Sequence, residues 1–481
     1  MLFNSFQFLV FFPLVTLIYF VLPHRYRWFH LLLASCVFYM AFIPVYILIL
    51  FFTIIIDYFA GIMIEESLGY CRKVFLTLSI LANVLVLAVF KYYNFFITNW
   101  NDLATSLQLP IHDLPYLHII LPIGLSFHTF QAMSYTIEVY RGNVKAERHP
   151  GYYSLYVMYY PQLVAGPIER PQNVLPQLHA YHPFDYSKLV SGMRLMLWGV
   201  FKKVVIADRL SIMVNEVYNH PGSYTGFAYV LATVLFGIQI YCDFSGYSDI
   251  AIGSARTMGI DLMKNFSRPY FAATISEFWR RWHISLSTWF RDYLYIPLGG
   301  NRVSAMRGMI NMLIIFMISG LWHGASWNFV IWGALHGLYS ITGSIFHRRF
   351  SFMSKVNLVN ILLTFMLVNF AWIFFRAATF HSAMQMVTHL FSAPHGKSYF
   401  ALLEYDLQGN ATYLSLPFWK FASSLLLIPI LFVIDWFIEG GYISFFDKRP
   451  TIVKWSVYYL FILAILIFGV FDTDSFIYFQ F

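Results

Sequence analysis

Long apolar stretches, separated by short loops that carry arginine and lysine, fill most of this sequence. Residues 6–23, 74–90 and 356–375 are three such stretches. About 20 apolar residues are needed to cross a bilayer as a helix, and only helices and closed barrels satisfy their backbone hydrogen bonds in lipid. With 59% apolar and 11% charged residues, the chain is predicted to be an all-α polytopic membrane protein. It should hold about ten to twelve transmembrane helices, with further re-entrant or interfacial helices.

Basic residues at the ends of the apolar stretches predict which loops face the cytoplasm. Arg25 and Arg27 follow the first stretch, so the N-terminus is expected to lie outside. Pro44 interrupts residues 28–62, which predicts a helical hairpin. The chain then returns to the basic pair Arg72–Lys73, so the first two inner loops agree on one topology.

The next segments predict a less regular path. Residues 92–118 hold neither lysine nor arginine, which is typical of an external loop. Residues 152–166 are short and contain Pro161, which indicates a bent or interfacial segment. Residues 188–206 are amphipathic, and they either cross the membrane or lie on its surface. No internal repeat is visible, which argues modestly against a transporter built from two symmetric halves.

Charge and cysteine content exclude several classes of protein. The net charge of +8 comes from the loops, so contact with the anionic lipid of the bilayer is expected and nucleic-acid binding is not. Cys36, Cys71 and Cys242 are too scattered for a disulfide framework or a cysteine-based zinc site, and no metal is expected. A single membrane domain over residues 1–481 is predicted.

Residues 239–337 are the exception to the apolar composition. They contain six of the thirteen tryptophans, a dense group of charges and three histidines, His283, His323 and His336. Ionisable residues at membrane depth cost free energy and are therefore functional candidates. This stretch is predicted to be the catalytic core of the domain.

His323 is the first candidate catalytic residue. It follows Trp322 in SGLWHGASW and lies between Gly320 and Gly324. Glycine is costly inside a helix, so an irregular backbone is expected, and at membrane depth such backbone lies in protein or along a wet cavity. An imidazole with an ordinary pKa of about 6.5 suits a general base for a hydroxyl. The alternative is a core histidine bonded to a helix carbonyl, which the flanking glycines and tryptophans make the weaker interpretation.

His283 is the second candidate. It lies in SEFWRRWHISLSTWFRDY, most of which reads as one helix. Helical spacing would place His283 on one stripe with Trp279, Leu286 and Phe290. An interfacial helix with an aromatic belt explains the tryptophans, but it gives no reason for a histidine on that stripe.

Charged residues on the same segment limit where it can lie. Arg280 and Arg281 prevent the helix from facing lipid, so it should lie at an interface or tilt into a polar cavity. Glu277 and Arg281 are four residues apart and can pair.

Three further residues are weaker candidates. Asp243 and Asp249 lie in an apolar run, where uncompensated carboxylates are costly. They either fix the fold through hydrogen bonds, which is the favoured interpretation, or orient a catalytic group. Tyr478 lies in the terminal FIYFQF. Its default role is an interfacial aromatic anchor, and the alternative is a hydroxyl that accepts an acyl group and passes it on.

Six segments, in order, resemble the membrane-bound O-acyltransferases, and within them the bacterial branch that acetylates alginate or peptidoglycan. The segments are MLFNSFQFLVFFPLVTLIYFVLP, YYPQLVAGPIERPQ, FKKVVIADRL, residues 239–302, SGLWHGASWNFVIWGALHG and FIYFQF. Any one of them is a weak signal, and six in order are specific.

The resemblance implies a helical membrane enzyme whose site lies in a central tunnel that joins the two faces of the bacterial inner membrane. His323 matches the family's invariant histidine, and His283 matches its second functional position. The implied reaction moves an acetyl group from cytoplasmic acetyl-CoA towards an extracytoplasmic polysaccharide, often through a separate transferase subunit.

In that reaction, His323 would deprotonate the accepting hydroxyl and His283 would orient or polarise the thioester carbonyl. Trp322 and Trp279 would support the site, and Arg280–Arg281 would lie near the phosphates of the donor. Two alternatives stay open. One is transfer of another acyl group, such as D-alanine, to a cell-wall polymer, and the other is a transporter or flippase with no chemistry.

Overall fold

The computed structural model describes residues 1–109, 114–164, 166–224, 226–349, 358–391, 402–405, 411–439, 446, 448–471 and 477. The chain divides into two compact units. The first holds Met1–Met196 and Ser248–Met263, and the second holds Leu197–Tyr247 and Lys264–Phe481.

Helices long and apolar enough to cross a membrane dominate the described residues. There are eight of them in this part of the chain, and Phe6–Val21 is a shorter apolar helix. The prediction of an all-α polytopic membrane protein is therefore confirmed. The eight are Pro44–Glu66, Gly69–Ser106, Gly226–Thr257, Ala305–His323, Trp327–Phe346, Leu358–Arg376, Phe418–Ile438 and Thr451–Phe468.

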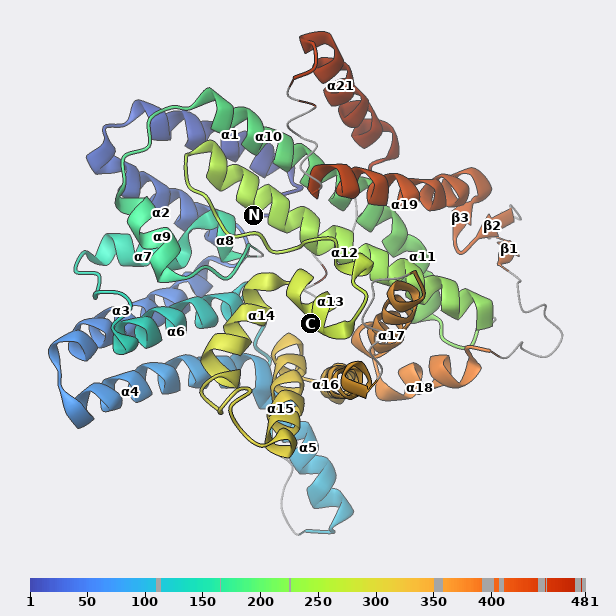
Figure 1. The fold of residues 1–481 in the computed structure, drawn as a ribbon, viewed down its shortest axis with the longest axis horizontal. Helices are drawn as coiled ribbons and strands as arrows, with labels where there is room; N and C mark the ends of the chain where they lie inside the picture. Colours follow the sequence, from blue (N-terminus) through green and yellow to red (C-terminus); the bar gives the residue numbers. More distant parts are fainter. Residues whose placement is uncertain are drawn as a thin grey trace. The chain divides into compact units, whose positions relative to one another are not determined.

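In the first unit, α3, α4 and α6 pack against one another, and α2 packs against α7 and α8 (Figure 1). The predicted hairpin is confirmed, because α2 ends at Met40 and a 3-10 turn at Pro44–Tyr46 precedes α3. The helices that lie wholly in the first unit are α1 (Phe6–Val21), α2 (His24–Met40), α3 (Ile47–Glu66), α4 (Gly69–Leu87), α5 (Tyr93–Ser106), α6 (Leu125–Arg141), α7 (Pro150–Met158), α8 (Tyr160–Leu163) and α9 (Pro171–His179).

The external loop predicted at residues 92–118 is wrong in its first half. α4 continues through a π-helical turn into α5, which ends at Ser106. The side chains of Asn94 and Asn101 on α5 exchange hydrogen bonds with the backbone of the returning segment 114–117. A lack of basic residues predicts which side of the membrane a segment faces. It does not predict whether that segment is helical.

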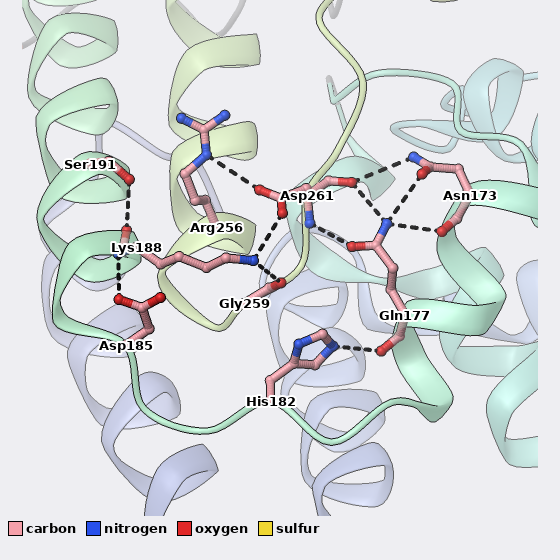
Figure 2. A network of polar contacts seen from close by, with 9 residues as sticks. All are labelled: Asn173, Gln177, His182, Asp185, Lys188, Ser191, Arg256, Gly259 and Asp261. Carbon is pink, nitrogen blue, oxygen red and sulfur yellow. Dashed lines mark hydrogen bonds and ion pairs between the residues drawn. The ribbon is translucent and has the colours of Figure 1, made fainter. Parts of the chain in front are cut away.

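A polar network around Asp261 fixes the connections of the first unit (Figure 2). The Asp261 carboxylate pairs with Lys188 at 2.9 Å and with Arg256 at 3.5 Å. Its backbone N–H donates to the side chain of Gln177 on α9. Partly exposed ion pairs contribute little stability one by one, so the value of this network lies in joining three segments at one residue.

Two long helices contribute residues to both units, α10 (Tyr186–Val200) and α12 (Gly226–Thr257). The remaining elements belong to the second unit. They are η3 (Phe201–Ala207), α11 (Asp208–Asn219), η4 (Pro269–Phe271), α13 (Ile275–Arg281), α14 (Ile284–Phe290), η5 (Arg291–Tyr295), α15 (Ala305–His323), α16 (Trp327–Arg349), α17 (Leu358–Arg376), α18 (Phe380–His389), α19 (Phe418–Glu439), α21 (Thr451–Phe468) and the short strands β1 (Leu403–Tyr405), β2 (Ala411–Tyr413) and β3 (Leu416–Pro417).

α15 and α16 form a closely packed helical hairpin (Figure 1). A side chain at Gly320 would collide with the carbonyl oxygen of Phe329, and one at Gly333 with that of Phe316. Small residues allow helix backbones to approach this closely in membranes. The backbone is regular through Gly320, so the expected irregularity begins only at Gly324, which caps α15 in an extended conformation.

Candidate active site

His283 lies at a break between two short helices. α13 ends at Arg281 and α14 begins at Ile284, so the single helix predicted for this segment is wrong. His283 has the left-handed backbone angles φ 42° and ψ 56°. That conformation costs a non-glycine residue about 1–3 kcal/mol and persists only where the surroundings enforce it.

Asn265 enforces this conformation. Its backbone carbonyl accepts the N–H of Ile284, and its side-chain Oδ1 accepts the backbone N–H of Ser285 at 3.2 Å and the Ser285 hydroxyl at 2.9 Å. His283 Nδ1 lies 3.1 Å from the same oxygen. Because a backbone N–H can only donate, Oδ1 is identified as the acceptor, and His283 must carry its proton on Nδ1.

The tautomer and burial of His283 define what its imidazole can do. Burial lowers its pKa from the ordinary 6.5 to about 3, so the ring is neutral near pH 7 and Nε2 carries a lone pair. Polarising a carbonyl would need a proton on Nε2. The geometry therefore favours His283 as a proton or hydrogen-bond acceptor over the carbonyl-polarising role expected from the sequence.

His323, the last residue of α15, is buried among aromatic rings. The ring centroids of Trp322, Trp332 and Phe375 lie 5.0, 5.1 and 5.4 Å from its imidazole, all edge to face. An aromatic enclosure of this kind excludes bulk water, which strengthens electrostatic interactions with a bound substrate.

Trp322 lies between the two predicted catalytic histidines. Its indole is 5.0 Å from the ring of His323 and 6.4 Å from the ring of His283. Phe244 packs edge to face on His283 at 4.6 Å. The structure thus brings His283, His323 and Trp322 together in one buried cluster of the second unit, although forty residues separate the two histidines in sequence.

Buried hydrogen-bond donors surround this cluster. Trp279 donates its indole N–H to Nδ1 of His336 at 3.3 Å, so the His336 proton must lie on Nε2. Within the described residues, neither this nitrogen nor the indole nitrogens of Trp332 and Trp372 have a hydrogen-bond partner. Buried polar groups are normally paired, so these three donors are suited to bind water or a substrate carbonyl.

A pocket of about 170 Å³ opens beside the cluster. Trp279, Leu286 and Phe290, three of the four residues on the predicted stripe, line the pocket. Ser319, one helical turn before His323 on α15, also lines it. The walls are mostly apolar, which suits a hydrophobic or extended portion of a ligand.

Asp243 belongs to a buried group of charges. Its Oδ1 lies 2.6 Å from Nζ of Lys203, and that ammonium lies 2.7 Å from Asp208. Its Oδ2 accepts the backbone N–H of Ile477 at 2.7 Å. Buried carboxylates need such partners, and Asp243 is held in an ion-pair network; its part in the site stays a prediction.

The other predicted site residues have different surroundings. Arg281 pairs with Glu277 at 2.5 Å, as the spacing predicted, whereas Arg280 is exposed. Asp249 is half-buried and belongs to the first unit, so its part in the site stays a prediction. Tyr478 lies outside the described residues.

Sequence reasoning missed several residues of the site. Asn265 gave no local signal, because it lies eighteen residues before His283. Trp332 was visible only as one tryptophan among many. Lys203 and Asp208 gave the clearest overlooked signal, since charges inside the apolar FKKVVIADRL must find partners.

Comparisons with known proteins agree with this picture. The sequence model of the membrane-bound O-acyltransferase family matches residues 75–384. A probable alginate O-acetylase AlgI from Pseudomonas aeruginosa is 38% identical over 399 residues, which cover 82% of this chain and 75% of that protein.

Two further relatives are similar. The peptidoglycan O-acetyltransferase of Helicobacter pylori is 36% identical over 388 residues, which cover 74% of this chain and 72% of that protein. The teichoic acid D-alanyltransferase of Bacillus subtilis is 27% identical over 291 residues, with 56% and 72% covered. The chain therefore belongs to the membrane-bound O-acyltransferase family and is a multi-pass membrane acyltransferase.

Proposed function

We propose that this acyltransferase moves an acetyl group from cytoplasmic acetyl-CoA towards a polysaccharide outside the bacterial inner membrane. The alginate O-acetylase and the peptidoglycan O-acetyltransferase, which match the chain over most of its length, support the acetyl group and the polymer. The observation that carries the proposal is the buried cluster in which His283 and His323 flank Trp322.

The two histidines would manage the proton of the accepting hydroxyl. The hydroxyl oxygen attacks the thioester carbonyl carbon, its proton passes to the imidazole of His323, and the C–S bond breaks as the thiolate leaves. The imidazolium then returns the proton to the thiolate, so no other reactant is needed. Nε2 of His283, which carries a lone pair, would accept a hydrogen bond and fix the hydroxyl for attack.

The pocket beside the cluster is the proposed path of the donor. Its apolar walls suit the extended chain that carries a thioester, and Trp279 and Ser319 place one end of the pocket near the buried histidines. Arg291 also lines the pocket. Arg280 is exposed on α13 and is available to contact a donor phosphate, whereas Arg281 is engaged by Glu277.

The donor's carbonyl oxygen needs hydrogen-bond donors as negative charge develops on it. The indole N–H groups of Trp332 and Trp372 are buried near His323 and have no partner among the described residues. We assign the stabilisation of that oxygen to this group, with Trp332 the first candidate.

The remaining parts of the proposal concern topology and delivery. The basic loops after the first apolar stretches favour an N-terminus outside the cytoplasm. A separate extracytoplasmic acetyltransferase subunit would complete transfer to the polymer, and Tyr478 would be the residue that passes the acetyl group on.

Transfer of D-alanine is the second candidate function, because the D-alanyltransferase of Bacillus subtilis is also similar. Deletion of the gene, followed by mass spectrometry of the cell-wall and secreted polysaccharides, separates the two. Loss of O-acetyl groups that return with the wild-type gene supports the proposal. Loss of D-alanyl esters with O-acetyl groups intact would replace acetyl by D-alanine, and unchanged polymers would overturn both.

A further inference from the structure

Ile477, near the end of the sequence, is bonded to a buried group of charges in the second unit. We propose that Lys203 and Asp243 form a socket that fixes the backbone of Ile477, the residue before Tyr478 in the sequence, for catalysis. The inference rests in part on the proposed function, since Tyr478 follows Ile477 in the sequence, but the positioning of Ile477 itself is independent of the acyl group that is transferred.

Three hydrogen bonds attach described residues at and after the end of α21 to one region of the second unit. Arg209 donates to the carbonyl oxygen of Phe468 at 2.7 Å, where α21 ends. The N–H of Val470 donates to the carbonyl of Val204 at 3.0 Å. The Ile477 bond to Asp243 follows seven residues later, and Ile477 is only 3% exposed. Ile477 is therefore docked into protein.

The π-helical turn η3 makes this attachment possible. It widens the helix at Phe201–Ala207, and π-helical turns are frequent at functional sites. Val204 offers its carbonyl to Val470, and Lys203, the preceding residue of the turn, extends to Asp243. One local departure from α-helix thus supplies both a backbone acceptor and the buried cation of the socket.

Asp243 needs its full carboxylate for this task. One oxygen forms an ion pair with the Lys203 ammonium, and the other accepts a hydrogen bond from the Ile477 N–H. An asparagine has a single acceptor oxygen and presents an NH₂ group on its other side. Asp243→Asn therefore cannot keep both contacts, and Ile477 should be released although the side-chain volume hardly changes.

Adjacent lysines provide a matched control. Lys202 is as deeply buried as Lys203, but its Nζ donates to the Ser245 hydroxyl at 2.8 Å. Replacement of either lysine by methionine keeps the apolar stem and removes one buried charge. Only Lys203→Met removes the cation that holds Asp243.

The decisive measurement is the accessibility of position 477 in the full-length protein. In a background with Cys36, Cys71 and Cys242 replaced, Ile477→Cys is reacted with a maleimide in detergent. Loss of a hydrogen bond to a charged group shifts a local equilibrium by roughly tenfold or more. Labelling should therefore be slow in the background protein and with Lys202→Met, and at least about tenfold faster with Lys203→Met or Asp243→Asn. Equal rates in all four proteins would overturn the proposal.

A kinetic measurement separates positioning from general damage. Ile477→Pro removes the backbone donor, whereas Ile477→Val keeps it. Ile477→Pro and Asp243→Asn should each lower kcat with little change in the KM for acetyl-CoA, and the double variant should be no worse than either. Additive losses, or a loss with Ile477→Val equal to that with proline, would contradict the socket. If the unaltered protein transfers no acetyl group, the proposed function fails, and the labelling result still decides the positioning.

Discussion

Replacement of Asn265 by alanine should inactivate the enzyme without touching either histidine. The Asn265 Oδ1 accepts from His283 Nδ1 and from both the N–H and the hydroxyl of Ser285. Each buried donor left without an acceptor costs about 1–3 kcal/mol, so the variant loses about 3–6 kcal/mol of local stabilisation if part of the loss is relieved by relaxation. Without these bonds, the cost of the left-handed conformation of His283, about 1–3 kcal/mol, is no longer offset, so His283 should change its backbone angles and leave the site.

The expected kinetic effect follows from the role of His283 in fixing the accepting hydroxyl. Misplacement of a reacting group by about 1 Å can cost about 10²-fold in rate, so kcat should fall by about 10²-fold in Asn265→Ala. Asn265→Asp keeps an acceptor in place and adds a negative charge, which raises the pKa of His283. Its activity should persist at high pH, with the acidic limb of the pH–rate profile moved to higher pH.

The assay is consumption of acetyl-CoA by protein purified in detergent, with the amount of folded protein checked by gel filtration. Asn311→Ala is the control, because Asn311 is another buried asparagine of the second unit and its side chain donates to the Leu298 carbonyl at 3.0 Å. Wild-type kcat in Asn265→Ala, or an equal loss in Asn311→Ala, would refute the argument.

Three further predictions concern stability and the donor site. Because burial lowers the pKa of His283 to about 3, the unfolded chain binds a proton below pH 6.5 that the folded chain does not. The free energy of unfolding should therefore decrease as the pH is lowered below about 6.5, by up to about 1.4 kcal/mol per pH unit from this group. In thermal unfolding at pH 7 and pH 5, His283→Gln should show a smaller decrease between the two pH values than the wild type. Gly320→Leu should separate α15 from α16 and cost about 1–3 kcal/mol, whereas Gly343→Ala, with nothing within 4 Å, should be neutral or slightly stabilising; equal effects would contradict the close packing. Trp332→Phe should lower kcat by about 10²-fold at unchanged KM for the donor if its N–H stabilises the thioester oxygen, and an unchanged kcat would remove that assignment.

The amino-acid sequence predicts the membrane class and the helical hairpin well, because both depend on local signals. A span needs only a sufficient run of apolar residues, and Pro44 ends a helix by its own chemistry. His323 is also a local prediction, since its glycine and tryptophan neighbours are adjacent in the chain.

The missed features depend on distant partners. Helical spacing made residues 275–290 look like one helix, but the backbone and side chain of Asn265 break it at His283 and enforce a left-handed residue there. The bond from Asp243 to Ile477 joins residues 234 positions apart, and no pattern of spacing signals such a contact. The periodicity of a segment indicates the secondary structure that it prefers by itself. Hydrogen bonds to residues distant in sequence determine where the folded protein departs from that preference.

The central claim is that His323 takes the proton of the accepting hydroxyl in a buried aromatic site. The most direct test compares wild-type protein with His323→Ala, purified from the same membranes in equal yield, for transfer of isotopically labelled acetyl from acetyl-CoA. The account predicts that the variant is as abundant and as well folded as the wild type and transfers no detectable acetyl group. Full transfer by His323→Ala would contradict it.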